Sequence, residues 1–333
     1  MWNASKCDLC GDCLVKCLYT DYGRDEAVVE IKALMDCKEA GILSKCISCF
    51  GCHEYCPTGA DPFDLIYEMQ EKTGIHPVKW RISSGFLDKF NAPTELIPGD
   101  PDKPALVSGT APIPEGALEG QLFQGMTVAI GGKYYCMFGS LHFGGKRFIE
   151  DNAQRFIDEI AGLGKDIIFI QDDCYIMTHV QIKEYGLTVP FKYMSMCEYL
   201  CNYLRDHQSS ITKLGKKVAY HRNCSSRYAP ENEAFIDEIF ELVGAERPPR
   251  KYEGEAALCC GALMALGGLP EEQAAEVQAK NVNDAIACGA DALITYCPLC
   301  YRTLQQPASR LGLTEIYITD LCRMALGEKP WPA

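Results

Sequence analysis

The segment NVNDAIACGADALITYCPLCYRTL, from Asn281 to Leu304, decides the fold of this chain. It predicts the end of a helix, a short apolar strand and then a turn that carries a Cys-x-x-Cys pair. A similar segment, RFIDEIAGLGKDIIFIQDDCYIMTH, runs from Arg155 to His179 in nearly the same register, and both lead to a further strand and a last helix. Strands that alternate with helices indicate a largely parallel α/β sheet, and the repeat predicts two related halves.

The sequence around the second segment continues the alternation. KKVAYH at 216–221 predicts a strand, and ADALITY and EIYITDL predict two more. LPEEQAAEVQAKNVNDAIACG predicts a helix that Pro270 opens and Gly289 closes. ENEAFIDEIFELVGA predicts a helix with one apolar face, made of Phe235, Ile236, Ile239, Phe240 and Val243.

The chain divides by composition. Residues 75–120 include NAPTELIPGDPDKPALVSGTAPIPEG, whose proline and glycine content predicts an ordered loop or linker without regular elements. We therefore expect a multidomain fold of mixed α+β and α/β type, with a helical, cysteine-rich domain at 1–74 and α/β halves at 121–214 and 215–333. Within the first domain, DEAVVEIKALMDC predicts an amphipathic helix, and a second helix is expected to have Asp61 as N-cap, Pro62 at its first position and Gly74 at its end.

Charge and cysteine content restrict the class of protein. The 333 residues carry a net charge of −13, which argues against nucleic acid or an anionic membrane surface as a partner. The 20 cysteines would suggest disulfides in a secreted chain, but the start MWNASKCDLC has no apolar signal core. No apolar run is long enough for a transmembrane segment. We therefore expect a cytoplasmic protein with reduced, metal-binding cysteines, which reaches a membrane only through partners.

Two cysteine runs near the N-terminus share one spacing. Cys-x2-Cys-x2-Cys-x3-Cys begins at Cys7 and again at Cys46, and Pro57 follows the second run whereas Leu18 follows the first. This is the two-cluster bacterial ferredoxin pattern, in which the fourth cysteine of each run binds the other cluster. It predicts two cubane [4Fe-4S] clusters, and zinc fits poorly because its sites use separated pairs. The expected ligands are Cys7, Cys10, Cys13 and Cys56 for cluster 1, and Cys17, Cys46, Cys49 and Cys52 for cluster 2.

Five cysteines of the C-terminal half form another pattern, Cys-x34-Cys-Cys-Gly-x35-Cys-x2-Cys, each at the end of an α/β element where open sheets bind their ligands. The pattern, with YHRNCSSR around its first cysteine, resembles the CCG domain of heterodisulfide reductase catalytic subunits (HdrB and its fusion form HdrD). It is also similar to iron–sulfur subunits of glycolate oxidase and anaerobic glycerol-3-phosphate dehydrogenase, and to the Hdr-like subunit of class II benzoyl-CoA reductase complexes. The five cysteines are Cys224, Cys259, Cys260, Cys297 and Cys300.

The resemblance implies that these five cysteines hold one further [4Fe-4S] cluster, a non-cubane one in which adjacent thiolates bridge or cap irons. Two other interpretations stay open: an ordinary cubane with one spare thiol, and buried cysteines that act as small hydrophobic residues. His221 is a candidate catalytic residue because it stands beside the first cysteine. The weaker candidates are three further histidines, His53, His142 and His179. Three cations could offset the negative charge of a cluster: Lys133, Arg222 and Arg227.

The first half lacks most of this motif. Tyr134 and Tyr135 stand where the double cysteine is expected, and Asp172 or Asp173 stands near the first cysteine of the later pair. Only Cys136 and Cys174 remain near matching places, so we expect one cluster rather than two in the C-terminal region. Core packing is expected for Cys197 and Cys201, and no role is assigned to Cys37, Cys288 and Cys322.

The predicted function is that of an iron–sulfur oxidoreductase subunit, which relays electrons within an anaerobic multi-subunit complex. No Gly-x-Gly-x-x-Gly follows a strand, so no flavin is expected in this chain and the partners would be an HdrA-like flavoprotein or another electron donor or acceptor. One alternative is a catalytic reductase of a CoM-S-S-CoB-type heterodisulfide, with a thiol or disulfide substrate. Another is the iron–sulfur subunit of a glycolate, lactate or glycerol-3-phosphate type dehydrogenase. The sequence leaves open whether the CCG cluster is catalytic.

Overall fold

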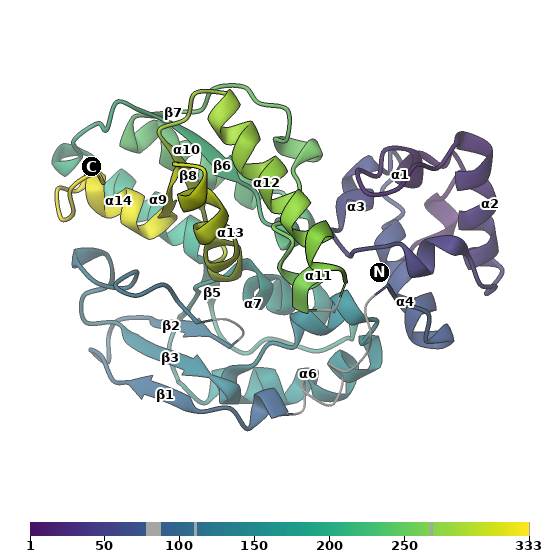
Figure 1. Ribbon diagram of the computed structural model, residues 1–333. Coiled ribbons are helices and arrows are strands. Elements are labelled where there is room, and N and C mark those ends of the chain that lie inside the picture. Colours follow the sequence, from purple (N-terminus) through teal and green to yellow (C-terminus); the bar gives the residue numbers. More distant parts are fainter. Residues whose placement is uncertain (78–87, 110–111, 267–268, 333) are drawn as a thin grey trace.

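Two sheets form the body of the molecule, shown in Figure 1 as a computed structural model that describes residues 1–77, 88–109, 112–266 and 269–332. The first sheet has the order β1-β3-β2-β4-β5, and only the β1–β3 pair is antiparallel. The second has the order β7-β6-β8-β9 and is wholly parallel. The strands are β1 (Thr94–Ile97), β2 (Ala105–Ser108), β3 (Thr127–Gly131), β4 (Ile167–Phe169), β5 (Tyr193–Ser195), β6 (Lys216–His221), β7 (Ala245–Glu246), β8 (Ala292–Thr295) and β9 (Thr314–Tyr317).

The two sheets repeat one topology. Strands β3-β2-β4-β5 and β7-β6-β8-β9 have the same order, and each sheet therefore carries the crossover expected of a parallel α/β unit. The mixed α/β character predicted from the sequence is confirmed, while the division into domains stays a prediction. The helices are α1 (Asp12–Val15), α2 (Arg24–Met35), α3 (Gly51–Tyr55), α4 (Pro62–Thr73), α6 (Lys146–Ala161), α7 (Asp172–Ile176), α8 (Ile182–Glu184), α9 (Met196–Asp206), α10 (Asn232–Val243), α11 (Ala262–Leu266), α12 (Glu271–Ala287), α13 (Pro298–Arg310) and α14 (Ile318–Ala325).

The expectation that residues 75–120 hold no regular element is wrong. Both β1 and β2 lie in this range, and β2 is a central strand between β3 and β4. Its residues Ala105, Leu106 and Val107 are completely buried. A short apolar run between turn residues is typical of a strand buried on both faces, and the surrounding prolines and glycines hid this one. The part of this range at 78–87 and 110–111 lies outside the described residues.

The helices predicted from periodicity form close to their expected positions. Helix α10 buries Ile236, Ile239, Phe240 and Val243, while the fifth expected residue, Phe235, is partly exposed. Helix α4 begins at Pro62 and ends before Gly74, as predicted. Asp61 precedes it with a left-handed backbone (φ 56°), but its side chain makes no capping hydrogen bond. The Asp61 carboxylate instead lies 3.4 Å from Nδ1 of His53.

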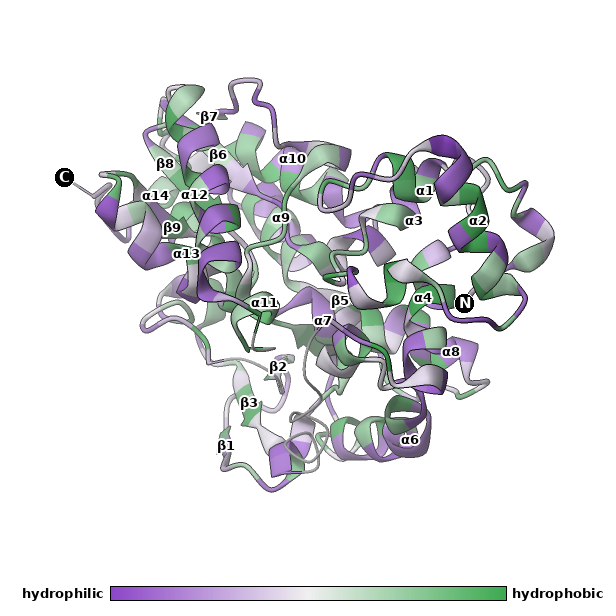
Figure 2. Ribbon diagram, turned by 45° about the vertical axis from the view of Figure 1, so that its right-hand side comes forward, coloured by the Kyte–Doolittle hydropathy of each residue, from purple (hydrophilic) through white to green (hydrophobic). Residues whose placement is uncertain are grey.

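One apolar core joins the two sheets. It contains Leu106 and Ile168 of the first sheet together with Val218 and Ile294 of the second, and α9 and α10 pack against each other within it. Figure 2 shows mixed hydrophobic and hydrophilic colouring along α6, as expected for a helix with one face on a core. Helices α1–α4 gather at one end of the body (Figure 1). None of the helices in the described part of the chain combines the length and apolar character that a bilayer crossing requires.

Candidate functional site

The two N-terminal cysteine runs have matching backbone turns. In each run the residues directly before and after the second cysteine have positive φ: Leu9 and Gly11 in the first, Ser48 and Phe50 in the second. A left-handed conformation costs a non-glycine residue about 1–2 kcal/mol. Such strain persists where the surrounding structure fixes it, as in loops that hold a ligand. The turns bring together the first three cysteines of each run.

The structure gathers four of these thiols into an outer thiol group, defined as Cys7, Cys10, Cys13 and Cys56. All four line one hollow of the N-terminal region. Burial raises the pKa of Cys13 to about 12, and the neighbouring thiols of Cys56, Cys10 and Cys7 add to the shift. This is the grouping expected for cluster 1, in which the last cysteine of the second run joins the first run.

The other four thiols form an inner thiol group, Cys17, Cys46, Cys49 and Cys52. Burial raises the pKa of Cys46 to about 12, and Cys17 contributes to the shift. Burial also raises the pKa of Cys52, with contributions from Cys46, Cys13, Cys49 and Cys17. Cys13 therefore lies close enough to Cys52 to link the two groups electrostatically. The four-sulfur donor sets fit iron–sulfur clusters, which are held by cysteine thiolates.

Five further thiols meet at the carboxyl ends of β6 and β8, and we call them the Cys-Cys-Gly site. Cys224 follows β6, Cys297 precedes the first residue of α13, and Cys300 lies in its first turn. Cys259 and Cys260 come from the loop before α11. All but Cys224 are buried, with Cys297 the most exposed of the four at 7%. The parallel pairing of β6 with β8 brings these loops to the same edge of the sheet.

The five thiols contact one another in a chain. Cys224 interacts with Cys259, Cys259 with Cys260, Cys260 with Cys300, and Cys300 with Cys297. Hydrogen bonds from Cys224 and Cys260 lower the pKa of Cys259, and the backbone N–H of Gly261 lies 3.4 Å from its Sγ. The structure thus brings together all five residues that the motif predicted. A buried set of soft sulfur donors with a stabilised thiolate fits iron better than a hard cation.

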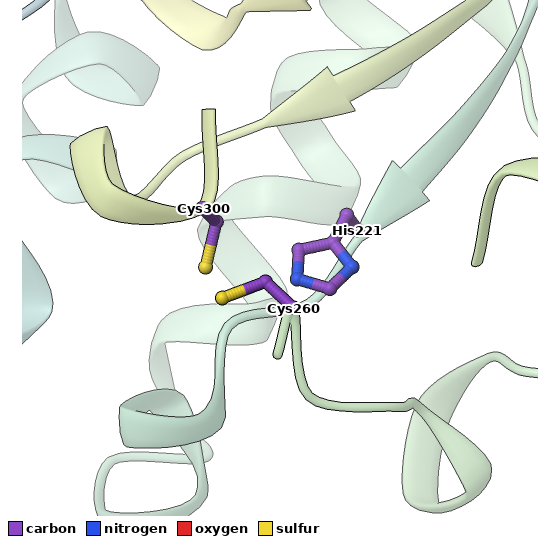
Figure 3. A group of neighbouring side chains, drawn as sticks. All are labelled: His221, Cys260 and Cys300. Carbon is purple, nitrogen blue, oxygen red and sulfur yellow. The ribbon is translucent and has the colours of Figure 1, made fainter. Parts of the chain in front are cut away.

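His221 adds a nitrogen atom to this sulfur set. One donor atom each of His221, Cys260 and Cys300 lies within 4.8 Å of the others, and Figure 3 shows the ring beside both sulfurs. The ring is 1% exposed, and its Nδ1 lies 3.1 Å from Oδ1 of Asn281. Burial and the nearby Arg250 lower the pKa of His221 to about 4. The sequence singled out His221 but gave no sign of Asn281, which lies sixty residues further along the chain.

Tyr19 joins the inner thiol group to the Cys-Cys-Gly site. The backbone N–H of Cys259 donates to the Tyr19 hydroxyl over 2.7 Å. Burial raises the pKa of Tyr19, and Cys49 and Cys259 are the next causes, so the phenol lies near both thiol groups. No sequence pattern identifies Tyr19, because nothing local marks a tyrosine two residues after Cys17.

A cluster of buried charged side chains also connects the N-terminal cysteine loops to the Cys-Cys-Gly site. Glu54 of α3 stands between Cys52 and Cys56 and forms ion pairs with Arg222 and Arg227. The Arg222–Glu54 distance is 2.6 Å, and Arg227 also donates to the carbonyl of Ala257 over 2.8 Å. Both arginine side chains are almost fully buried. The two arginines that the sequence assigned to charge compensation therefore connect the cysteine loops of the two regions.

The remaining polar candidates separate into those near a thiol group and those away from it. His142 Nδ1 lies 2.9 Å from the carbonyl of Ser48, whose hydroxyl donates to the His142 carbonyl, and the pair holds the inner loop against the first half. Burial lowers the pKa of His142 to about 4. Lys133 pairs with Glu159 at the surface, and His179 contacts the Tyr193 hydroxyl at 3.2 Å. His53 lies between Asp61 and Asp64, so its ring nitrogens contact two carboxylates rather than a thiol.

The first half keeps the backbone of the motif without most of its cysteines. Met137 has φ 61° directly after Cys136, as Gly261 has φ 81° after Cys260. Cys136 interacts with Cys174 as Cys260 does with Cys300. Cys136 therefore stands at the position of Cys260, and Tyr135 at the position of Cys259. The double cysteine matches Tyr135 and Cys136 rather than Tyr134 and Tyr135.

Gln171 caps α7 as Cys297 caps α13, so it is Gln171, not either aspartate, that matches the first cysteine of the later pair. Asp172 is buried and accepts a hydrogen bond from Asn223, next to Cys224, over 3.0 Å. The carboxyl ends of the strands in the two sheets therefore face each other. Cys197 and Cys201 lie in the common core, as expected, and Cys322 joins them there. The other two cysteines without an assigned role lie at the surface (Cys37) and at the end of α12 (Cys288).

Comparisons with known proteins agree with this site. The family model of the cysteine-rich domain CCG matches residues 218–305. Over 147 residues the chain is 27% identical to one subunit of the dihydromethanophenazine:CoB–CoM heterodisulfide reductase of Methanosarcina mazei. This match covers 43% of the chain and 36% of that protein, so the chain spans well under two thirds of its curated relative.

A solved structure, that of a hypothetical protein from Helicobacter pylori, shares the fold. It aligns with a TM-score of 0.60 at 16% identity, over 90% of this chain and 64% of that one. Together with the CCG match, the weak homology to the Methanosarcina protein supports the resemblance to HdrD/HdrB-like CCG-domain iron–sulfur proteins. The cysteine-rich N-terminus fits an iron–sulfur redox protein of this kind.

Proposed function

We propose that the chain is an iron–sulfur electron-transfer subunit of an anaerobic, Hdr-like multi-subunit redox complex. The outer and inner thiol groups would each hold a cubane [4Fe-4S] cluster, and the Cys-Cys-Gly site a further, non-cubane one. The observation that carries the proposal is the position of Tyr19, whose hydroxyl accepts the N–H of Cys259 while its ring lies near Cys49. This contact puts the inner group next to the Cys-Cys-Gly site.

The order of the three groups follows from their contacts. Cys13 and Cys52 connect the outer group to the inner one, and Tyr19 connects the inner group to Cys259. Clusters bound at these positions would supply one-electron carriers. The chain itself would hold them in sequence and set the spacing through Glu54, Arg222 and Arg227. Electrons would pass from one end of this series to the other.

The ends of the series point to the kind of partner. The outer group lines a hollow of the N-terminal domain, beside Trp2 and Leu9, so an electron donor or acceptor on another chain would dock there. An HdrA-like flavoprotein is the partner that the resemblance suggests, in a cytoplasmic complex. The Cys-Cys-Gly site would exchange electrons with a second redox partner or with a thiol or disulfide substrate.

A second candidate is catalytic reduction of a heterodisulfide. The name of the Methanosarcina relative favours it, since that protein belongs to a CoB–CoM heterodisulfide reductase. Against it, the first half retains only two cysteines at its sheet edge. A reaction that holds both halves of a disulfide on two such sites would lack one of them here.

Iron and acid-labile sulfide per chain, measured on anaerobically purified protein, test the proposal. Three [4Fe-4S] clusters predict about 12 iron atoms per chain. Low-temperature EPR of the oxidised protein, with and without an added thiol, then separates the two candidates. About 12 irons without a response to thiol support the relay, and a thiol-dependent signal supports the reductase. A content of about 8 irons, with no cluster at the Cys-Cys-Gly site, would refute the proposal.

A further inference from the structure

The buried ring of His221 has one nitrogen without a hydrogen-bond partner. The residue ends β6, three positions before Cys224, and its side chain points to the Cys-Cys-Gly site beside Cys260 and Cys300 (Figure 3). Its Nε2 is buried and has no partner among the described residues. A buried polar atom without a partner is costly, so its position next to two sulfurs calls for an explanation.

Asn281 determines which ring nitrogen carries the hydrogen. The amide nitrogen of Asn281 donates to the carbonyls of Cys259, at 2.9 Å, and Val277, at 3.0 Å. Both of its hydrogens are then used, so its oxygen faces His221 and must accept. The hydrogen of the ring therefore lies on Nδ1, and a neutral ring presents the lone pair of Nε2 to the sulfurs.

This arrangement is that of a metal-binding histidine. A histidine that ligates a metal donates its other ring N–H to a fixed acceptor, which sets the tautomer and the orientation of the ring. Here the acceptor is Asn281, and the same amide also holds the carbonyl of Cys259. The residue that orients the imidazole thus also positions the double cysteine.

We propose that His221 is a nitrogen ligand of the iron–sulfur cluster in the Cys-Cys-Gly site, with Asn281 as its positioning residue. The inference rests on the proposed function in one respect, namely that this site holds a cluster. Six donors, five sulfurs and one nitrogen, would then serve four irons, which leaves sulfurs free to bridge. A neutral imidazole in place of a thiolate raises the potential of a cluster, as in Rieske centres.

The experiment is pulsed EPR on the full chain, purified anaerobically from cells grown with ¹⁵N-histidine and from unlabelled cells. The paramagnetic state of the Cys-Cys-Gly cluster is expected to show the strong hyperfine coupling of a directly bonded nitrogen, and this coupling changes with the label. The His221→Ala variant should lose it while it keeps its iron content. His142→Asn, which alters another buried histidine near Cys259, should keep it.

Each outcome decides the inference. A cluster without a directly bonded histidine nitrogen, or with only the weak coupling of a hydrogen bond, overturns it and leaves the proposed function intact. Loss of the coupling in His142→Asn instead of His221→Ala also overturns it. If His221→Ala fails to fold, the ¹⁵N label in the wild-type chain still decides whether a histidine nitrogen is bonded. Asn281→Ala then removes the acceptor of Nδ1–H, so the nitrogen coupling should shift, and an unchanged coupling refutes the role of Asn281. An iron count that lacks this cluster altogether refutes the proposed function itself.

Discussion

The two α/β halves share their strand order, but their sheet edges are built differently. In the second half five thiols contact one another, whereas the first half keeps Cys136 and Cys174 and places Tyr135 and Gln171 at the other positions. Both substitutes are buried in the first half. Tyr135 is 2% exposed in the apolar core, and Gln171 accepts a hydrogen bond from Ser108 over 2.9 Å.

The comparison of the two halves shows that the backbone turn of the motif can form without its full set of cysteines. The positive φ of Met137 shows that the first half keeps the turn of the motif even where a glycine would relieve the strain. The turn therefore does not depend on a complete set of thiols. The second half adds a connected set of sulfurs and contacts with the N-terminal region, in which Cys259 binds Tyr19 and both Arg222 and Arg227 bind Glu54.

The largest expected difference between the halves is in iron content. Cys260 lies between Cys259 and Cys300, so Cys260→Ser should remove the central sulfur of the site. About 4 of about 12 irons per chain should be lost. The matched change Cys136→Ser, in the first half, should leave the iron content unchanged. Iron and sulfide analysis of both variants makes the comparison, and equal losses would mean that the first half also holds a cluster.

The second difference concerns how each half holds the N-terminal domain. Glu54→Gln leaves the buried guanidinium of Arg227 without its counter-charge. Breaking a buried ion pair in this way costs about 3–5 kcal/mol. Ser48→Ala removes the smaller, neutral contact with His142 of the first half and should cost about 1 kcal/mol. Denaturant unfolding of anaerobically purified variants measures both.

If Glu54→Gln and Ser48→Ala shift the unfolding midpoint equally, the charge cluster does not dominate the contact between the N-terminal region and the two halves. Glu238→Gln is a useful control, because Glu238 of the second half pairs with Arg205 of the first half at the surface, away from the N-terminal region. Its midpoint should be close to that of the wild type, since solvent screens such pairs.

The third difference concerns Asp172, a buried acidic group at the sheet edge of the first half. Burial raises the pKa of Asp172 from 3.8 to about 7, against the hydrogen bond from Asn223 that lowers it. The folded state thus binds a proton that the unfolded state releases, so stability is lost as the pH rises from about 4 to about 7. Asp172→Asn should become more stable relative to the wild type across this window, by up to about 4 kcal/mol.

Unfolding curves at a series of pH values test this expectation. The difference between Asp172→Asn and the wild type should grow up to about pH 7 and stay constant above it. A constant difference for Asp172→Asn over the whole range would mean that this carboxyl is ionised in the folded state.

The predictions that succeeded depend on local patterns. The two N-terminal cysteine runs and the Cys-Cys-Gly pattern named the thiols that the structure gathers into the three groups, because ligand spacing is visible along the chain. That these thiols bind clusters stays a prediction. Helices α4 and α10 follow from their apolar faces and end residues. The mixed α/β character follows from the repeat around Asn281–Leu304, since each copy forms one helix–strand–helix unit.

The features that local patterns missed depend on distant partners. Strand β2 is recognisable only from its pairing with β3 and β4, and its own flanks resemble a linker. Tyr19 and Cys259 are 240 residues apart, and Glu54 and Arg227 are 173 apart. The sequence marks Asn281 only as a helix residue, although its amide orients both His221 and Cys259. Such contacts arise from packing between segments far apart in the sequence, which no local pattern records.

The smallest expected effect tests what the Tyr19 contact contributes to the second half. Tyr19→Phe keeps the buried ring but removes the acceptor for the N–H of Cys259, and an unsatisfied buried donor costs about 1–2 kcal/mol. Tyr55→Phe is the matched control, because the Tyr55 hydroxyl also crosses to the second half, at Glu255, without touching the double cysteine. Both variants should lose a similar amount of stability. Only Tyr19→Phe should alter the EPR signal of the Cys-Cys-Gly cluster and slow its reduction through the inner group. If both variants leave that signal unchanged, Tyr19 is a structural contact alone, and the electron path runs through other atoms of the interface.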